Sequence, residues 1–216
     1  PAALFGIALS GTRTALVAVI PAAVFGLTSL TRLRVSVRIV ILILMIVAIY
    51  SLLPLVPATS FERLSTTGDE LSSGDLNGRI LIWRDGFASF SEHPLLGVGS
   101  NMFRSANRIG KVAHNSFISV LVEVGIIGFA LFVMTLFIVF TQAFEHQRWD
   151  SYFWLTILAT WFIGASALTW EHAKPTWLFM SLLIASASLH RTQNSAVSPG
   201  WREVPETRLA SQTIQE

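Results

Sequence analysis

The sequence predicts an all-α protein: a polytopic transmembrane helix bundle, with a large outer loop that contains a short amphipathic helix. Of its 216 residues, 52% are hydrophobic and 13% are charged, whereas a soluble domain carries about 25% charge. The mean hydropathy is +0.60. Long apolar runs also alternate with short polar segments. These observations indicate an integral membrane protein, and the absence of cysteine excludes disulfides and thiolate chemistry.

The apolar runs predict about five full spans plus a truncated one, because a hydrocarbon core of roughly 30 Å needs about 20 helical residues. The predicted spans are residues 14–30, 39–56, 117–140, 151–170 and the shorter 175–189. The opening run Pro1–Ser10 is too short to span, so we expect the chain to begin within a helix and to lack an N-terminal half. The expected divisions are transmembrane helices at 1–56 with a basic loop at 31–38, the outer loop at 57–113, transmembrane helices at 114–190, and a disordered cytoplasmic tail at 191–216.

Basic residues in the short loops predict the orientation. The segment 31–38 holds three arginines and no acidic residue, and further arginines follow residue 189. Short loops rich in Lys and Arg face the cytoplasm. The loop at 145–150 then also lies inside, while 57–113 and the turn around Glu171 lie outside.

The outer loop has two parts of different composition. Its first part is rich in Ser, Thr, Gly and Asp, which favour turns. In its second part Ile80, Trp83, Phe87 and Phe90 recur every three or four residues, which predicts one apolar face of a short helix. We expect Asp75 or Asn77 to cap this helix at its start, and a tight glycine turn to follow it.

Ionisable side chains gather on the predicted outer side and suggest a functional site, because such residues are costly near the hydrocarbon boundary. They come from four separate segments: Arg13, Arg79, His114 and the pair Glu171 and Lys174. Arginine suits phosphate because its planar fork donates two parallel hydrogen bonds and keeps its charge. A neutral histidine can accept a hydroxyl proton near neutral pH. The set suggests transfer from a phosphate-activated donor.

Each residue also has a purely structural interpretation, which the sequence leaves open. Arg13 could anchor its helix at the headgroups, and Arg79 or Arg84 could pair with Asp75, Asp85 or lipid phosphate. His114 and Asn115 could cap the helix that follows, and Trp83 could be an interfacial anchor. We expect Glu123 to bond to a neighbouring helix, and the histidine spacing shows no metal-binding pattern.

Three motifs in order resemble the O-antigen ligase and O-antigen polymerase family of membrane glycosyltransferases. His114-Asn115 is followed after nine residues by Gly125-Ile126-Ile127-Gly128. The stretch "GRILIWRDGFASFSEHPLLGVGSNMF" is similar to the family's periplasmic Arg-x-x-x-Trp helix and His-Pro-Leu-x-Gly-x-Gly turn. "SGTRTALVAV" is similar to its Ser-Arg-Gly-Ala helix start, although Thr12 and Thr14 replace Ser and Gly. The resemblance covers about residues 10–140.

The resemblance implies a metal-independent, multi-pass glycosyltransferase of the bacterial inner membrane, with its active site facing the periplasm and no cofactor. Its donor substrate is a glycan on undecaprenyl pyrophosphate. Its acceptor is the lipid A core in a ligase, another lipid-linked repeat in a polymerase, or a Ser or Thr side chain in protein oligosaccharyltransferases. Its partners are membrane lipid and these substrates, with no nucleic acid.

The implied roles follow the motif positions. The catalytic residues would be His114 and Arg79, the pyrophosphate ligands would be Arg13, Arg79 and Arg84, and the supporting residues would be Asn115, Trp83 and Glu171. Gly125 and Gly128 would allow close approach of a neighbouring helix. The ligase is the leading interpretation. The alternatives are an O-antigen or exopolysaccharide polymerase, or a non-enzymatic polysaccharide transporter or assembly subunit.

Overall fold

The computed structural model describes residues 13–52, 54 and 78–196, and within these ranges it contains helices and no strands. The predicted all-α class is therefore confirmed for this part of the chain. The helices are α2 (Arg13–Leu30), α3 (Val35–Leu52), α6 (Arg79–Glu92), α7 (Ser116–Ala143), α8 (Arg148–Ala165) and α9 (Lys174–Ala196). Residues 191–196 are helical, so α9 continues past the predicted start of the tail at 191. The remainder of the predicted tail and most of the Ser- and Gly-rich part of the outer loop lie outside the described residues.

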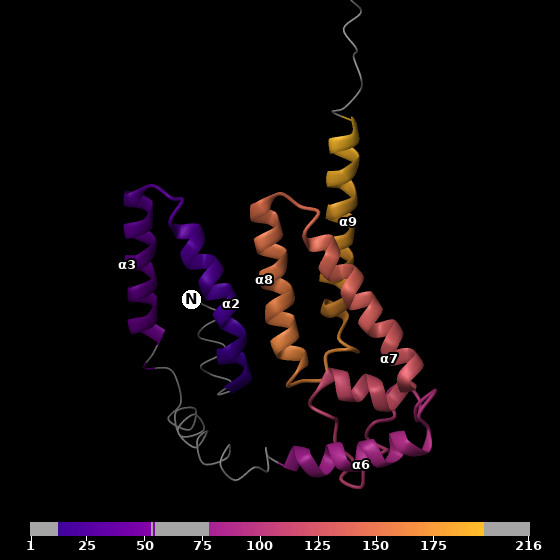
Figure 1. Ribbon diagram of the computed structural model, residues 1–216. Coiled ribbons are helices and arrows are strands. Elements are labelled where there is room, and N and C mark those ends of the chain that lie inside the picture. The colour runs from indigo at the N-terminus through magenta and orange to yellow at the C-terminus, as the bar shows by residue number, and fades with distance from the viewer. Residues whose placement is uncertain (1–12, 53, 55–77, 197–216) are drawn as a thin grey trace, which may run out of the picture.

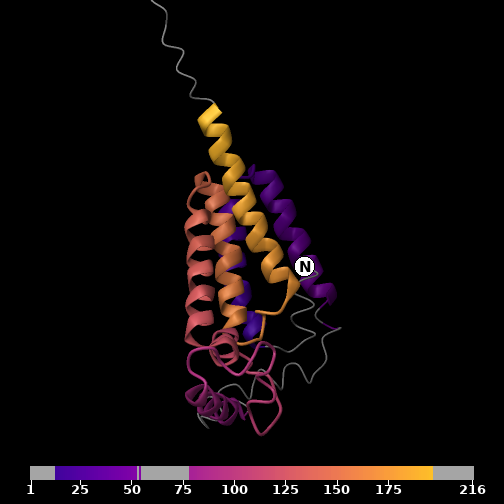
Figure 2. The same cartoon turned by 90° about the vertical axis from the view of Figure 1, so that its right-hand side faces the viewer.

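The helices form an upright bundle with a separate layer at one end, which we call the α6 end (Figure 1). α2 packs on α8, while α7 packs on both α8 and α9. α6 lies across the α6 end of the bundle, where α2, α7 and α9 begin and α8 finishes (Figures 1 and 2). The short connections from α2 to α3 and from α7 to α8 lie at the opposite end. The two predicted inner loops thus share one end of the bundle.

Two arginines of the basic loop act structurally at the end opposite α6. The Arg32 guanidinium lies 3.4 Å from the ring centroid of Trp149, which joins the α2–α3 loop to the start of α8. Arg38 donates hydrogen bonds to the carbonyls of Leu30 and Thr31 at the end of α2. A guanidinium over an indole face is a favourable cation–π contact. These arginines therefore fasten the helix ends in addition to supplying positive charge.

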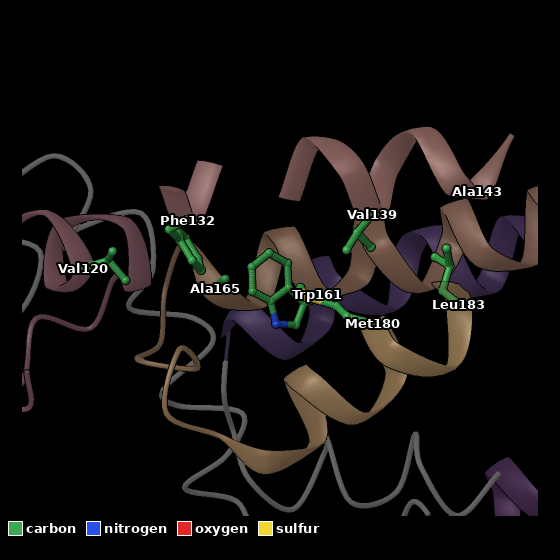
Figure 3. Packing of buried hydrophobic residues seen from close by; sticks show 8 residues of the cluster. All are labelled: Val120, Phe132, Val139, Ala143, Trp161, Ala165, Met180 and Leu183. Atoms are coloured by element: carbon green, nitrogen blue, oxygen red, sulfur yellow. The ribbon is translucent and has the colours of Figure 1, made fainter. Parts of the chain in front are cut away.

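The bundle core is apolar and lies where α7, α8 and α9 meet (Figure 3). The Trp161 ring on α8 fills its centre, and Trp161 Nε1 donates to Thr176 Oγ1 at 3.0 Å. Leu183 of α9 is fully buried there. A buried indole N–H needs a hydrogen-bond acceptor, and the Thr176 hydroxyl oxygen supplies that acceptor for Trp161.

The predicted continuous span 117–140 is wrong in one respect, because α7 is broken at Gly125. Gly125 has φ 68° and ψ −172°, far from helical values. Residues 116–124 lie across the α6 end of the bundle, and the rest of α7 rises at an angle to them (Figure 1). A left-handed backbone is costly for residues with a Cβ, so glycine permits the break.

One described helix, α7, is long and apolar enough to cross a membrane, with a mean hydropathy of 2.6. Val17–Leu30 and Val35–Ser51 are apolar but shorter. α8 opens with Arg148 and Asp150, and α9 opens with Lys174, which lowers their apolar character. The predicted set of five full spans is therefore not confirmed for the described residues.

α6 confirms the predicted short helix, but the face that it buries differs from the predicted apolar face. Ile80 and Phe87 are exposed, while Ile82 and Gly86 are buried and Trp83 and Phe90 pack beside them. The buried face is thus rotated toward Ile82. It covers a second apolar cluster made by Ile82, Phe103, Ala113 and Val122. Gly78, with no side-chain hydrogen bond, occupies the N-cap position that we expected Asp75 or Asn77 to fill.

Candidate functional site

His114 lies just before α7 and has an unusual backbone conformation. Its φ is 51°, in the left-handed region, which few residues other than glycine adopt and where His and Asn are enriched. Such backbone outliers concentrate at functional sites because the surrounding structure must hold them in place. The left-handed turn separates the His114 side chain from the helix that its neighbour caps.

Asn115 takes the capping role that the sequence left open between the two residues. Its Oδ1 accepts hydrogen bonds from the N–H groups of Phe117 and Ile118 at 3.0 and 3.1 Å. Its Nδ2 donates to the Ser166 carbonyl at 3.1 Å, which ties the start of α7 to the end of α8. Asn115 therefore satisfies the exposed donors of the helix start, and His114 is not needed for that purpose.

Trp83 holds the residue before His114 from the side of α6. Its Nε1 donates to the Ala113 carbonyl at 2.7 Å, and Ala113 is fully buried. The hydrogen bond spans thirty residues of sequence, so it fixes α6 against the short segment that carries the imidazole. Trp83 therefore acts as a support for this segment, which goes beyond an interfacial anchor.

The surroundings of His114 favour its neutral form. Burial lowers the pKa of the imidazole below its ordinary value of 6.5, and the positive charges of Arg79 and Lys111 lower the pKa further. Burial disfavours the charged form, and nearby cations do the same for a second cation. The hydrogen bond from Trp83 to the Ala113 carbonyl places α6 against the His114 segment, in agreement with the effect of Arg79. A neutral imidazole beside a fixed cation is suited to accept a proton.

Arg79 and Arg84 make no hydrogen bond or ion pair with any other described residue. The carboxylate that the sequence offered them, Asp85, is taken by Arg108, whose Nε and Nη2 lie 3.1 and 2.9 Å from its two oxygens. This pair lowers the pKa of Asp85, chiefly through the hydrogen bond from Arg108. Arg108 thus takes the hydrogen bonds of Asp85, and Arg84 acts on Asp85 through its charge alone, while the other suggested partner, Asp75, lies outside the described residues.

The glycine turn after α6 is bonded directly to the break in α7. The N–H groups of Val98 and Gly99 donate to the carbonyls of Val122 and Glu123, at 3.0 and 2.8 Å. From the other side, Ile126 N–H donates to the Pro94 carbonyl at 2.9 Å. The segment 94–99 thus supplies partners to backbone groups that the interrupted helix leaves unpaired.

Gly125 and Gly97 are needed because the two backbones touch. A Cβ on Gly125 would lie 2.3 Å from the Leu95 oxygen, and one on Gly97 would lie 2.4 Å from the Glu123 carbonyl. The expected approach of a neighbouring helix to Gly125 and Gly128 is wrong, since the turn approaches Gly125 and Val124 of the same helix lies against Gly128. The recurrence of glycine in both motifs was the sequence signal for this joint.

Glu123 is the main polar centre of the α6 end and was missed as such by the sequence analysis. Its carboxylate is buried, with 4% of the residue exposed. It accepts hydrogen bonds from the N–H groups of Asn101 and Phe103, and it lies 3.1 Å from His172 Nε2. The predicted partner was a neighbouring helix, whereas the observed partners are two loops and Ser119 of its own helix.

The turn between α8 and α9 completes the α6 end. Ser116 Oγ donates to the Leu168 carbonyl and accepts from Trp170 N–H, both at 2.8 Å. Glu171 follows in the same turn and is buried, yet neither of its carboxylate oxygens has a hydrogen-bond partner among the described residues. His172 Nε2 is 3.9 Å from Glu171 Oε1. His172 thus lies between two buried carboxylates, only one of which is satisfied.

Comparison with known proteins identifies the family. The family model described as O-Antigen ligase matches residues 2–133, more than half of the chain. The chain belongs to the O-antigen ligase family. No curated protein and no solved structure matches it. The matched range includes α2, α3, α6, His114 and the break of α7, which confirms the resemblance seen in the motifs.

Family membership supports a membrane protein with a glycan-transferring, ligase-type activity. The O-antigen ligase match stops before the α8–α9 turn, so Glu171 and His172 enter the candidate site through the geometry alone. Arg13 is the first residue of α2, which begins at the α6 end (Figure 1), and its side chain is not among those that the structure describes. Within the described residues, no group of three or more His, Cys, Asp or Glu side chains is placed to hold a metal ion.

Proposed function

We propose that this member of the O-antigen ligase family transfers a glycan from undecaprenyl pyrophosphate to the lipid A core at the periplasmic face of the bacterial inner membrane. The observation that carries the proposal is the hydrogen bond from Trp83 Nε1 to the Ala113 carbonyl, which holds α6, the helix that begins at Arg79, against the residue before His114. An imidazole biased toward its neutral form stands beside a guanidinium with no protein partner in the described chain. One group can receive a proton while the other receives a phosphate.

In the proposed step, the acceptor hydroxyl oxygen attacks the anomeric carbon of the donor sugar. A new C–O bond forms, the bond from that carbon to the pyrophosphate oxygen breaks, and the electron pair leaves with undecaprenyl pyrophosphate. The hydroxyl proton passes to a ring nitrogen of His114. A positioned base contributes typically 100-fold to 10,000-fold to such a step.

The leaving pyrophosphate gains negative charge as the bond breaks, and fixed guanidinium groups stabilise that charge without reorganisation. Arg79 is the principal ligand, because its charge already acts on His114. Arg84 lies on the exposed side of α6, and Arg13 begins α2 at the same end of the bundle. With such cations in place, the proposed reaction uses no metal ion or cofactor.

Supporting residues keep the imidazole in place. Asn115 caps α7 and bonds to Ser166, while Trp83 bonds to the Ala113 carbonyl. Glu171 has a buried carboxylate with no hydrogen-bond partner among the described residues and with His172 Nε2 at 3.9 Å, and its part would be to accept a hydrogen bond from the His172 ring or from a substrate hydroxyl when the turn adjusts. Burying an unpaired carboxylate is costly, so a fold that retains one has a use for it.

A polymerase of the same family would use the same chemistry with a lipid-linked repeat as acceptor. Deleting the gene separates the two: unattached lipid-linked polymer indicates a ligase, and accumulated single repeats indicate a polymerase. A transporter or assembly subunit would not require His114 to accept a proton. Transporters place their sites near mid-bilayer, whereas α6, which carries Arg79 and Arg84, and the start of α7, which follows His114, lie at the α6 end of the bundle (Figure 1).

The test is glycan transfer by the purified full-length protein from a lipid-linked donor. We expect His114→Asn to lower the rate about 100-fold or more, because asparagine tolerates the left-handed backbone but cannot act as the base. Arg79→Lys should lower it by about 100-fold, since an ammonium cannot reproduce bidentate contact. A chelator should leave the rate unchanged.

Two matched controls make this assay specific. Arg108→Lys changes an arginine of the same loop that is already paired with Asp85, and His190→Ala removes a ring at the opposite end of the bundle. Both should transfer glycan at near-normal rates. Near-normal transfer by His114→Asn would contradict the proposed base, and full activity of Arg79→Lys would contradict the phosphate clamp.

A further inference from the structure

Two adjacent leucines project from the turn that follows α6. Leu95 is 61% exposed and Leu96 is 74% exposed. They lie between Pro94 and Gly97, in the segment that is bonded to the break in α7. Single exposed apolar residues are common on proteins, but neighbouring large ones on a fixed turn indicate a contact surface.

The backbone of this turn is held on both sides, so the leucines cannot fold away. Gly97 N–H donates to the His93 carbonyl at 2.9 Å, which closes the turn. Ile126 N–H and Ile127 N–H donate to the Pro94 and Leu95 carbonyls. Because a Cβ on Gly97 or Gly125 would overlap the opposite backbone, the two segments have no room to slide. Exposure of Leu95 and Leu96 is therefore built into the joint.

The exposed leucines continue an apolar stripe of α7. Beyond the break, Ile127, Leu131, Met134 and Ile138 are all exposed and recur every three or four residues, along one side of the helix. The backbone hydrogen bond from Ile127 to Leu95 joins the turn to the end of this stripe that lies next to the break. One apolar surface thus runs from the turn onto the helix that is apolar enough to cross a membrane.

We propose that the turn 94–97 inserts Leu95 and Leu96 among the acyl chains of the lipid bilayer, next to the spanning part of α7. The occupant is hydrocarbon, because the surface is continuous with the stripe of a membrane-capable helix and the two leucines carry no polar group. The Pro94 and Leu95 carbonyls accept hydrogen bonds from α7, and Gly97 N–H donates to the His93 carbonyl, so these backbone groups can lie at the hydrocarbon boundary while the two leucine side chains enter it. This inference does not depend on the proposed enzymatic activity.

Insertion of the two leucines sets the depth of the candidate site relative to the bilayer. The turn holds the α7 break, so lipid contact at Leu95 and Leu96 fixes Gly125 at the hydrocarbon boundary. Residues 116–124 then lie along the membrane surface, and His114 at their start lies at headgroup level. A loop anchored in this way keeps the imidazole at one depth relative to any lipid-borne substrate.

The absence of cysteine from these 216 residues simplifies a direct test. Leu95→Cys and Leu96→Cys are labelled separately with a nitroxide in the full-length protein, in which any cysteine outside this sequence is first replaced by serine, and the labelled protein is reconstituted in lipid nanodiscs. Collision rates with molecular oxygen and with a water-soluble nickel chelate are then measured by electron paramagnetic resonance. Oxygen concentrates in hydrocarbon and the nickel chelate in water, so their ratio reports depth.

Two labelled positions calibrate the result. Met134→Cys lies on the exposed apolar stripe, and Ser105→Cys lies on the exposed part of the loop that follows the turn. The proposal predicts that both leucine positions favour oxygen as Met134 does. Ratios equal to those at Ser105 would overturn it by showing a turn in water. Low access to both reagents would also overturn it, by showing that a second copy or another part of the chain covers the leucines.

Discussion

The two parts of α7 on either side of Gly125 have similar apolar sequences but different surroundings. In residues 116–124 the buried polar side chains Ser116 and Glu123 bond to other segments of the chain. In residues 126–143 the hydroxyls of Thr135 and Thr141 bond only to carbonyls of their own helix. The first part is therefore fixed by polar partners that lie far away in sequence. The second part packs through its apolar surface, and a distant polar contact lies at its end, where Gln142 Oε1 accepts a hydrogen bond from Arg191.

This difference shows that the specific contacts of α7 are concentrated in residues 116–124. The second part contributes Phe132 and Val139 to the bundle core and leaves other apolar side chains exposed. Any apolar helix of suitable shape could do the same. The first part connects α6, the glycine turn and the α8–α9 turn around His114, so a change there should disturb the site more than an equal change in the second part.

The largest effect is expected at the break itself. Gly125→Ala forces a Cβ into the left-handed region at φ 68°, 2.3 Å from the Leu95 oxygen. We expect a loss of at least about 3 kcal/mol of unfolding free energy, because backbone strain and overlap add. Thermal unfolding of the detergent-solubilised protein measures it.

Two other glycines separate the causes of that loss. Gly110 has the same φ of 68° with open space around it, and Gly26 has open space on the helical backbone of α2. Gly110→Ala should lose only about 1–2 kcal/mol from strain, while Gly26→Ala should be neutral or slightly stabilising. Equal losses at Gly125 and Gly110 would show that contact between the turn and the break contributes nothing.

A smaller effect is expected at the polar centre of the first part. Glu123→Gln removes one acceptor from a buried group that serves Asn101 and Phe103, so we expect a loss of about 1–3 kcal/mol. Thr135→Val in the second part is the matched change and should alter stability by less than about 0.5 kcal/mol. Urea unfolding followed by circular dichroism compares the two, and equal losses would remove the distinction between the parts.

The smallest effect on stability should come from Trp83→Phe, which keeps an aromatic ring but removes the donor to the Ala113 carbonyl. We expect a loss of about 1 kcal/mol, together with a fall in kcat at little change in KM, because the His114 segment is less well held. Glycan-transfer kinetics measure this, with Trp154→Phe at the opposite end of the bundle as the control. A change confined to KM would contradict the positioning role.

Local patterns in the sequence were sufficient for part of the structure. The helix over Arg79–Glu92, the glycine turn after it and the helices around 14–30 and 117–140 follow from periodicity and apolar length. The face of α6 was wrong because Phe103 and Val122, which cover Ile82, come from later segments. Periodicity reports an apolar face but not which neighbour covers it.

The sequence alone could predict the members of the candidate site whose residue type by itself suggests a chemical role. His114, Arg79 and Trp83 stand out because ionisable and aromatic groups are unusual at such positions. The joint between the turn and Gly125, and the partners of Glu123, depend on backbone contacts across more than twenty residues. The glycines of both motifs mark the positions of the joint, but no local pattern encodes which segments meet there or which groups surround the Glu171 carboxylate.

The most direct measurement of the central claim is the pH dependence of kcat/KM for glycan transfer. Burial, Arg79 and Lys111 hold the pKa of His114 below 6.5, so the neutral base persists as the pH falls to 6.5 and is lost only below it. Activity should therefore decline below pH 6.5, and Lys111→Gln, which removes one nearby cation, should move this decline to higher pH. An unchanged midpoint in Lys111→Gln, or activity that rises on acidification, would contradict the assignment of His114 as the base.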